Sequence, residues 1–387
     1  MIQRIAAIAF ILSCTSVGWL ILGGTIEHRT YQSDGKLRLG VASIWGSPQE
    51  QGPPSASYMV PQGRQVELPL DSSRIKVALD LAHRQKGLLW YSTYVVDFSG
   101  AYTFRNPTDA PQLITFAVNF PAEHAIYDGL VMEVDGRAMP VVSDKYSARV
   151  TAQLGAEQTA TVRVAYRSHG LESWRYRLGD DVSQARDFVL QVRTNFKGID
   201  FPLNALSPTE KRETPDGWEL VWQYRNLISG FQIGVTMPEK LQPGPLAGQI
   251  SYFAPVSLLL FFFLMFIVTT LKSIDLHPMN YFFLAAAFFS FHLLLAYLVD
   301  HISIHLAFAI GSAVSIFLVV SYLRLVVGPR FAVVEAGGAQ LVYLVLFSYA
   351  FFLHGFTGLA VTIGCIVTLF VVMQLTARIR WAERFSR

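Results

Sequence analysis

Five apolar stretches of about 20 residues fill the last third of the chain and constrain its fold more than any other feature. The hydrocarbon core of a bilayer is about 30 Å thick, and a helix rising about 1.5 Å per residue crosses it in about 20 residues. We place these candidate spans at residues 253–271, 279–299, 304–323, 331–353 and 359–377. A sixth apolar stretch, residues 5–25, follows Arg4 near the N-terminus. The sequence therefore predicts six transmembrane helices.

The segments between the candidate spans contain residues that interrupt a lipid-facing helix. Proline and charge are both disfavoured in the hydrocarbon region. They occur in Asp275-Leu276-His277-Pro278, Asp300-His301, Gly328-Pro329 and His354-Gly355. The N-terminal stretch is longer than the apolar region of a typical signal peptide and lacks a convincing small-residue cleavage site. We therefore interpret it as a retained signal anchor.

The basic residues outside the middle of the chain predict the orientation. Cytoplasmic loops of membrane proteins carry an excess of Lys and Arg. With the N-terminus inside, one side receives all eight such residues, namely Arg4, Lys272, Arg324, Arg330, Arg378, Arg380, Arg384 and Arg387. The short outer loops at 300–303 and 354–358 contain none. We predict cytoplasmic termini and a periplasmic location for residues 27–250.

The composition, 52% hydrophobic and 15% charged, is an average over two unlike regions. Residues 27–250 contain 47 of the 59 charged residues, which is close to the usage of a soluble domain. The net charge of +3 is too small to indicate a nucleic-acid partner. The sequence thus predicts an anchor at 1–26, a periplasmic domain at 27–250, a five-helix bundle at 251–377 and a basic cytoplasmic tail at 378–387.

The predicted periplasmic domain shows the two-residue periodicity of half-buried strands. Apolar and polar residues alternate at 114–120, 160–166 and 218–224. Asp135-Gly136 separates two apolar runs and is a strong hairpin signal. Many short strands with turns at this spacing favour an antiparallel β-sandwich-like fold. Residues 46–63, rich in Pro, Gly, Gln and Ser, are predicted to form a loop.

No arrangement of residues in this domain indicates catalysis or a cofactor. Nucleophile, zinc-protease and phosphate-loop motifs are absent from the sequence. Cys14 and Cys365 are the only cysteines, and both lie in apolar stretches, so the domain has no disulfide. Its histidines, His28, His83, His124 and His169, are scattered singly, and the pair Asp180-Asp181 is interpreted as a solvated turn. We predict a protein without enzymatic activity and without a cofactor.

Four ionisable residues near the outer ends of the spans are weak candidates for a metal site. Asp300, His301 and His305 lie between the third and fourth spans, and the topology places His354 on the same side. His301 and His305 would share a helix face if the fourth span began early. The alternative is that these groups satisfy backbone atoms at helix ends and mark the membrane interface.

Other polar and small residues within the spans carry simpler predictions. His292 lies well inside the third span and is expected to hydrogen-bond to a neighbour as a neutral imidazole. Glu335 is expected to extend toward Arg330 at the inner end of the fifth span. His277 is a candidate cap for the third span. Small residues at 309, 311, 313 and 315 have the spacing that lets helices approach closely, although lipid-facing small residues are an alternative.

One motif combines Leu276, His277, Pro278, Met279, Asn280 and Tyr281, followed by Asp300 and His301. On this motif the chain resembles the CreD-like inner-membrane proteins of Gram-negative bacteria. Further similarities are Phe291, residues 293–295, Tyr322-Leu323 and Trp381, with weaker ones at 195–196, 206–209 and 218–222. The order of anchor, β-rich domain and five-helix bundle is similar too. The family usually has Tyr at His292, Glu at Asp300 and often Asp at Arg380, so a metal role of His292 is not a family property.

The resemblance implies a role in cell-envelope integrity, linked in the family to a two-component stress regulon and to colicin tolerance. It implies no known catalytic activity. The leading hypothesis is a non-enzymatic inner-membrane protein that contacts membrane lipids and an envelope protein partner. The alternatives are a transporter or channel subunit, a membrane enzyme using an outer His/Asp metal site, and a sensor or regulatory partner in envelope signalling.

Overall fold

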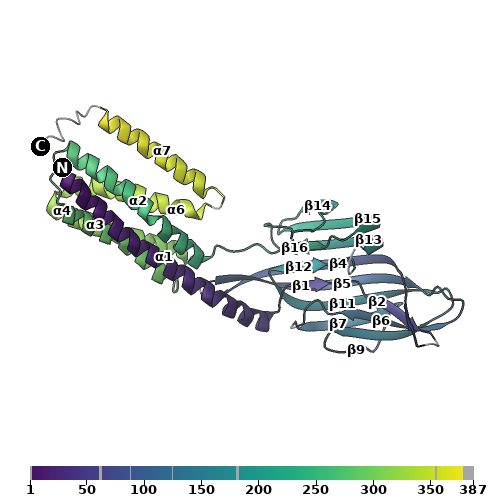
Figure 1. Ribbon diagram of the computed structural model, residues 1–387. Coiled ribbons are helices and arrows are strands. Elements are labelled where there is room, and N and C mark those ends of the chain that lie inside the picture. Colours follow the sequence, from purple (N-terminus) through teal and green to yellow (C-terminus); the bar gives the residue numbers. More distant parts are fainter. Residues whose placement is uncertain are drawn as a thin grey trace. The chain divides into compact units, whose positions relative to one another are not determined.

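The computed structural model describes residues 2–60, 63–87, 89–123, 125–179, 183–353 and 355–377 (Figure 1). The chain divides into two compact units, which are described separately. Unit 1 is helical and comprises Met1–Gly35, Gly87–Leu89 and Leu241–Arg387, as far as these are described. Unit 2 is rich in sheet and comprises Lys36–Lys86 and Trp90–Lys240. The units thus meet after residues 35 and 240, while the boundaries predicted at the membrane, after residues 26 and 250, stay a prediction.

Six helical stretches in the described residues are long and apolar enough to cross a membrane. Four are the continuous helices α2 (Pro243–Leu271), α3 (Pro278–Leu298), α4 (Ile304–Val326) and α7 (Thr357–Thr376). The fifth span, 331–352, is built from η1 (Phe331–Gly337), α5 (Gly338–Gln340), η2 (Leu341–Leu346), α6 (Phe347–Tyr349) and η3 (Ala350–Phe352). The prediction of six apolar helices is confirmed.

The first helix is much longer than the predicted anchor. Helix α1 runs from Ile2 to Trp45, whereas the apolar stretch ends at residue 25. Gly46 follows the helix with a φ of 95°, which suits glycine, and the Gly46 amide donates to the Ala42 carbonyl at 2.9 Å. Gly46 followed by Pro48 is a helix-stop signal, so the end of α1 is encoded by these residues rather than by hydrophobicity.

Small residues bring helices α3 and α4 close together. The Ser315 hydroxyl donates to the Ala287 carbonyl at 2.6 Å, and Gly311 faces Phe291. Ala309 and Ala313 are exposed on the surface of unit 1. The four predicted positions therefore divide by helix face, with 311 and 315 at the contact and 309 and 313 outside it.

We expect Gly311→Leu to destabilise the protein by about 1–3 kcal/mol, because overpacking forces side chains and backbone to shift. A Cβ atom at Gly311 would lie 3.1 Å from Phe291 Cδ2 and 3.2 Å from the Phe291 carbonyl oxygen. Thermal unfolding of the detergent-solubilised protein measures the effect. Ala309→Leu, on the exposed face of the same helix, is the matched control, and equal melting temperatures for the two variants would contradict the close contact.

The fifth span departs from regular α-helix along most of its length. Segments η1 and η2 are both π-helical, and η3 is a 3₁₀ turn. π-Helical turns are rare and occur frequently at functional sites. The irregular backbone of this span lines the cavity described below.

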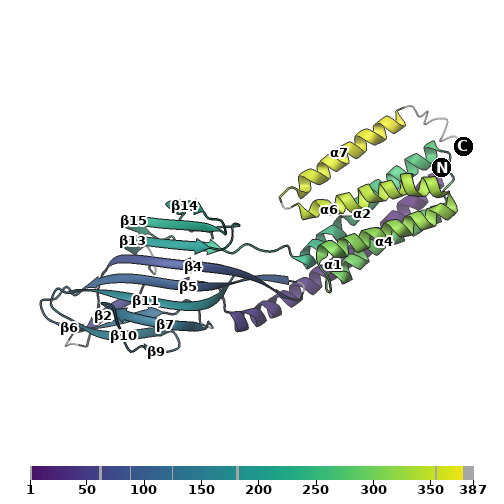
Figure 2. The same ribbon diagram turned by 180° about the vertical axis from the view of Figure 1, so that it is seen from behind.

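Unit 2 contains three sheets, whose strand orders are β1-β12-β16, β3-β2-β6-β10-β9 and β14-β15-β13-β4-β5-β11-β7-β8 (Figure 2). The strands are β1 (Gln49–Gln51), β2 (Ser55–Met59), β3 (Gln65–Glu67), β4 (Leu70–Lys86), β5 (Leu89–Arg105), β6 (Gln112–Asn119), β7 (Tyr127–Val134), β8 (Arg137–Ala138), β9 (Val142–Ser143), β10 (Ser147–Leu154), β11 (Thr159–Leu171), β12 (Ser173–Tyr176), β13 (Ser183–Thr194), β14 (Glu210–Glu213), β15 (Trp218–Ser229) and β16 (Ile233–Thr236).

The predicted strands and hairpin are present. Strands β6, β11 and β15 coincide with the three alternating stretches. Along β6 the buried side chains are Ile114, Phe116 and Val118, as the two-residue period requires. Val134 pairs with Arg137 across the turn Asp135-Gly136, where both residues have positive φ. That is the backbone conformation a two-residue type I′ hairpin needs.

One prediction about unit 2 is wrong and another holds only in part. Residues 46–63 were expected to form a loop, but they contribute β1 and β2. An antiparallel fold was expected, and β5 with β11 and β13 with β15 are antiparallel pairs, but β1 pairs with β12 and β4 pairs with β13 in parallel. The first error arises because buried strand residues such as Gln49 and Gln51 are polar, so this segment lacks the alternation of apolar and polar residues that marks a strand. The parallel pairs were missed because they join strands far apart in the sequence, and the periodicity of one segment does not indicate which other segment it pairs with.

Residues from all three sheets share one hydrophobic core. Trp174 from the first sheet, Phe116 from the second and Trp222 from the third are fully buried in it. The Trp222 indole Nε1 donates to the Leu206 carbonyl at 2.8 Å. The weak similarities at 195–196, 206–209 and 218–222 thus belong partly to one packed region of unit 2.

Candidate functional site

Asp300 forms an ion pair that the sequence did not indicate. Its Oδ2 lies 2.6 Å from Arg29 Nη2, and the Arg29 guanidinium also lies 5.5 Å from the centre of the Tyr297 ring. Arg29 belongs to the part of α1 beyond the predicted anchor, so it was counted with the aqueous domain. The continued helix brings it to the end of α3, where Asp300 receives a permanent positive partner.

The two described histidines near Asp300, His301 and His305, make their contacts with residues other than Asp300. The His305 ring lies 5.2 Å from the ring of Phe352, and the His301 amide donates to the Leu298 carbonyl at 2.9 Å. Helix α4 begins at Ile304 with Ser303 as its cap, so His301 precedes the helix and shares no helix face with His305. His354 lies outside the described residues. Among the described residues, no group of three His, Cys, Asp or Glu side chains could hold a metal ion.

The family-motif residues at 276–281 organise the start of α3. His277 caps the helix, because its Nδ1 accepts a hydrogen bond from the Met279 amide at 3.2 Å, and Pro278 follows as the first helical residue. The predicted capping role of His277 is therefore confirmed. The Tyr322 hydroxyl of α4 donates to Asn280 Oδ1 at 2.6 Å. Leu276 and Tyr281 are fully buried.

His292 is completely buried among aromatic side chains of unit 1. Its Nδ1 lies 3.2 Å from the Phe288 carbonyl of its own helix, which supplies the predicted neighbour, while Nε2 has no hydrogen-bond partner among the described residues. The His292 ring stacks on Phe288 and meets the edge of Trp19, with centroid distances of 5.8 Å in both cases. Trp19 Nε1 is likewise buried without a partner in the described chain. Such groups are where a buried water binds.

A second polar connection joins three helical segments by hydrogen bonds. The Gln340 amide Nε2 donates to the Ser315 hydroxyl at 2.8 Å, and Ser315 donates in turn to the Ala287 carbonyl. Gln340 is fully buried. The sequence analysis missed it, although an uncharged amide in the middle of an apolar span is a recognisable signal for a helix–helix contact.

Glu335 pairs with a different cation from the one predicted. Glu335 Oε1 accepts from Lys272 Nζ at the end of α2, rather than from Arg330. Its second oxygen, Oε2, is buried without a hydrogen-bond partner among the described residues. Arg4 lies at the same end of unit 1, 3.7 Å from Asp275. The Arg4 and Lys272 side chains, both predicted to be cytoplasmic, are therefore on one end of the bundle.

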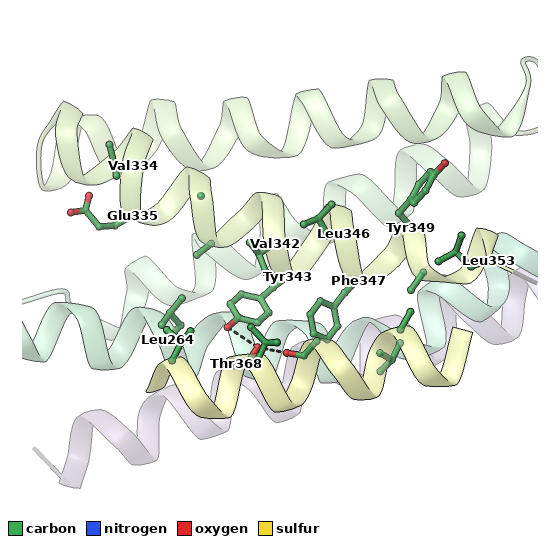
Figure 3. Close-up of a pocket in the computed structure, with 18 residues that line it drawn as sticks. Leu264, Val334, Glu335, Val342, Tyr343, Leu346, Phe347, Tyr349, Leu353 and Thr368 are labelled. Carbon is green, nitrogen blue, oxygen red and sulfur yellow. Dashed lines mark hydrogen bonds between the residues drawn. The ribbon is translucent and has the colours of Figure 1, made fainter. Parts of the chain in front are cut away.

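A cavity of about 560 Å³ lies between the fifth span and α7 (Figure 3). Figure 3 shows Glu335 at one end of the lining and Leu353 at the other, with Tyr343 and Phe347 directed toward α7. The Tyr343 hydroxyl donates to Thr368 Oγ1 at 3.1 Å. Nearly all other lining side chains are apolar, so the cavity offers hydrophobic contact with few polar groups.

In unit 2, the polar groups in the core serve the fold. Burial raises the pKa of the Tyr94, Tyr102, Tyr166 and Tyr176 hydroxyls well above the usual value. Each hydroxyl has a partner, and Tyr166, for example, donates to Gln51 Oε1 at 2.7 Å. His83 Nε2 contacts the Pro238 carbonyl, and the His169 ring packs on Trp45. His28 lies on α1, whereas His124 and Asp180-Asp181 lie outside the described residues.

Residues 225–382 match the family described as inner membrane protein CreD. The match includes α2 to α7 and both parts of the predicted motif, 276–281 and 300–301, whereas most of unit 2 precedes it. No curated protein matches the chain significantly.

Solved structures resemble the chain only distantly. A candidate nutrient-binding protein from Legionella pneumophila is 12% identical, with a TM-score of 0.37, over 55% of this chain and 75% of that one. An M1 zinc metallopeptidase from Deinococcus radiodurans is also 12% identical, with a TM-score of 0.29, over 43% of this chain and 42% of that one. Similarity at this level carries no functional argument.

Proposed function

We propose that this chain is a CreD-like inner-membrane protein that supports the integrity of the cell envelope without catalysing a reaction. The observation that carries the proposal is the family match over residues 225–382. The polar residues of the matched region fit this role, because they connect structural elements. His277 caps α3, Asn280 binds Tyr322, and Asp300 pairs with Arg29.

In this proposal both termini are cytoplasmic and unit 2 is a β-sandwich in the periplasm. The support is the distribution of charge along the spans. Arg4 and Lys272 lie at one end of unit 1, and the opposite loop 300–303 contains no Lys or Arg. At that opposite end, Arg29 is neutralised by Asp300. Unit 2 is then available to an envelope protein partner.

Cysteine labelling tests this orientation. Cys14 and Cys365 are first replaced by Ser, and a single cysteine is introduced by Ser143→Cys in unit 2 or by Ser273→Cys after α2. A membrane-impermeant maleimide should label Ser143→Cys in intact spheroplasts, but should label Ser273→Cys only after permeabilisation. The reverse pattern would refute the proposed topology.

Complementation of a deletion strain tests the function. We expect the deletion to reduce tolerance to detergent and colicin, and the full chain to restore it. His301→Ala and His305→Ala should complement like the original chain, because His301 donates a hydrogen bond through its backbone amide and His305 packs against Phe352. Unchanged tolerance in the deletion strain would contradict the proposal. Failure of both histidine variants, if they accumulate normally in the membrane, would favour a metal site or an ion pathway instead.

A further inference from the structure

The cavity between the fifth span and α7 lies wholly within the part of the chain that crosses the membrane. Its lining runs from Val334 to Leu353 on the fifth span and from Ala360 to Val371 on α7. The lining on the fifth span thus covers a stretch of about 20 residues, the number that a helix needs to cross the hydrocarbon core of a bilayer. A cavity of this shape suits a long, thin occupant.

The cavity opens sideways to the surroundings of the bundle. Val334, Leu346 and Val367 line it, and each is more than half exposed, at 64%, 57% and 55%. Helix α7 is the least embedded span, with only Thr368 and Val372 buried. The medium beside these residues is lipid, and an empty space there would forfeit dispersion contacts that an acyl chain can make.

The fifth span is shaped around this space. Lining residues Glu335 and Tyr343 belong to the π-helical segments η1 and η2. Gly338, between these segments, also lines the cavity, and a Cβ atom there would meet no heavy atom within 4 Å. The φ of Gly338 is −63°, an ordinary helical value, so the backbone conformation does not require glycine at this position. The effect of the missing side chain is to leave open volume in the cavity.

One end of the cavity carries a pair of opposite charges. Lys272 Nζ binds Glu335 Oε1, and the Lys272 side chain is 49% exposed, so it can reach a second anion. Glu335 Oε2 remains as a hydrogen-bond acceptor without a partner among the described residues. A zwitterionic headgroup complements this arrangement, with its phosphate toward Lys272 and its ammonium toward Glu335.

We propose that the cavity binds an ethanolamine phospholipid. One acyl chain lies between the fifth span and α7, and the headgroup lies across Lys272 and Glu335. Attraction between apolar surfaces is weak within a bilayer, so the headgroup pairing selects this lipid and the cavity shape orients it. The proposal depends on the membrane spans and is independent of the envelope role proposed above.

Native mass spectrometry of the full chain in detergent tests the proposal, with phosphatidylethanolamine or phosphatidylglycerol added as the probe. Gly338→Leu fills the cavity, and Gly358→Leu is its matched control. Both are helical glycines whose added Cβ meets nothing within 4 Å, but Gly358 does not line the cavity. Leucine is a better helix former than glycine, so neither change should impair folding. Glu335→Gln removes the acceptor charge.

We expect the unaltered protein to bind one phosphatidylethanolamine about tenfold more tightly than phosphatidylglycerol, as one charge-assisted hydrogen bond provides. Gly338→Leu should weaken binding of both lipids about tenfold or more, while Gly358→Leu should bind like the unaltered protein. Glu335→Gln should keep lipid binding but lose the preference for ethanolamine.

Three results would overturn the proposal. Equal lipid binding by Gly338→Leu and Gly358→Leu would exclude the cavity as the site. Equal affinity of the unaltered protein for the two lipids would exclude the assigned headgroup. A lipid-free dimer that Gly338→Leu abolishes would show that a second copy of the chain occupies the cavity. Thermal unfolding of each variant in the same detergent verifies that it is folded.

Discussion

Unit 2 is expected to unfold cooperatively at a pH about one to three units above 10, the ordinary pKa of tyrosine. Tyr94, Tyr102, Tyr166 and Tyr176 are buried in its core, and burial raises the pKa of each hydroxyl above its usual value near 10. The folded state therefore retains four protons that the unfolded state releases. Absorbance at 295 nm, which reports tyrosinate, and circular dichroism should change together.

The sign and size of the effect follow from proton linkage. A tyrosine whose pKa is higher in the folded state contributes stability that is fully present below pH 10 and lost as the pH rises toward the folded pKa. Between the unfolded-state and the folded-state pKa, each buried tyrosine lowers the free energy of unfolding by about 1.4 kcal/mol per pH unit. Four of them together remove about 5.5 kcal/mol of stability per pH unit, against a typical domain stability of about 5–15 kcal/mol.

A double variant separates this cause from general alkaline damage. The Tyr176 hydroxyl donates to the Tyr102 hydroxyl at 3.3 Å, so Tyr102→Phe with Tyr176→Phe removes both partners and leaves neither unsatisfied. We expect the unfolding midpoint to move upward, because two of the four fully buried tyrosines no longer titrate. Tyr146→Phe, at a side chain 57% exposed, should not move it. Full ionisation of all tyrosines before any loss of structure would contradict the argument.

Trp222→Ala is expected to destabilise unit 2 by about 3–5 kcal/mol, because deleting a large buried aromatic ring leaves a cavity that the surroundings fill only partly. Trp222 is completely buried in the shared core, and its indole also satisfies the Leu206 carbonyl. Loss of that partner adds to the cost. Denaturant unfolding of the full chain, followed by the β-sheet signal, measures the change in the free energy of unfolding.

Two further variants separate packing from hydrogen bonding. Trp222→Phe keeps most of the ring volume and loses the indole donor, so its cost should fall well below that of Trp222→Ala. Trp218, four residues earlier on β15, is only partly buried, although its Nε1 donates to the Lys197 carbonyl at 2.8 Å. Trp218→Ala should cost clearly less. Equal losses for Trp218→Ala and Trp222→Ala would mean that burial in the core is not the main cause.

The spans could be located from the sequence because the bilayer imposes a length on each of them. Predicted and observed limits agree within about three residues for α3, α4 and α7. The same criterion failed at α1 and at the start of α2. There the helices extend beyond the apolar stretches and include Arg29 in α1 and Gly244 in α2. Contacts with other parts of the protein stabilise these extensions, so their hydrophobicity does not reveal them.

The strands of unit 2 were predictable where one face is apolar, and the pairing of distant strands was not. The register of β6 and β11 follows from their alternating residues, and the hairpin at Asp135-Gly136 from its two turn residues. The parallel pairing of β4 with β13, for example Phe188 with Ser73, joins residues that are 115 positions apart. No local pattern carries that information.

Among the candidate site residues, the sequence identified several groups but rarely their partners. Capping by His277 was predictable, because the cap lies within two residues of its target. Asp300 and Glu335 were singled out as charges near the predicted membrane ends, but their partners Arg29 and Lys272 lie 271 and 63 residues away. The metal hypothesis for Asp300, His301 and His305 remains a prediction, because it includes His354, which is not among the described residues.

By itself, the sequence determined which segments are apolar enough to enter a membrane and which alternate as strands. Both properties come from nearest neighbours along the chain and from the length that a bilayer or a sheet face demands. The tertiary structure alone decided which polar groups meet. It also decided that the π-helical fifth span and α7 leave a cavity beside Gly338 that ends at Glu335. The physical reason is that partners and cavities depend on how distant segments pack, and packing is a property of the whole fold.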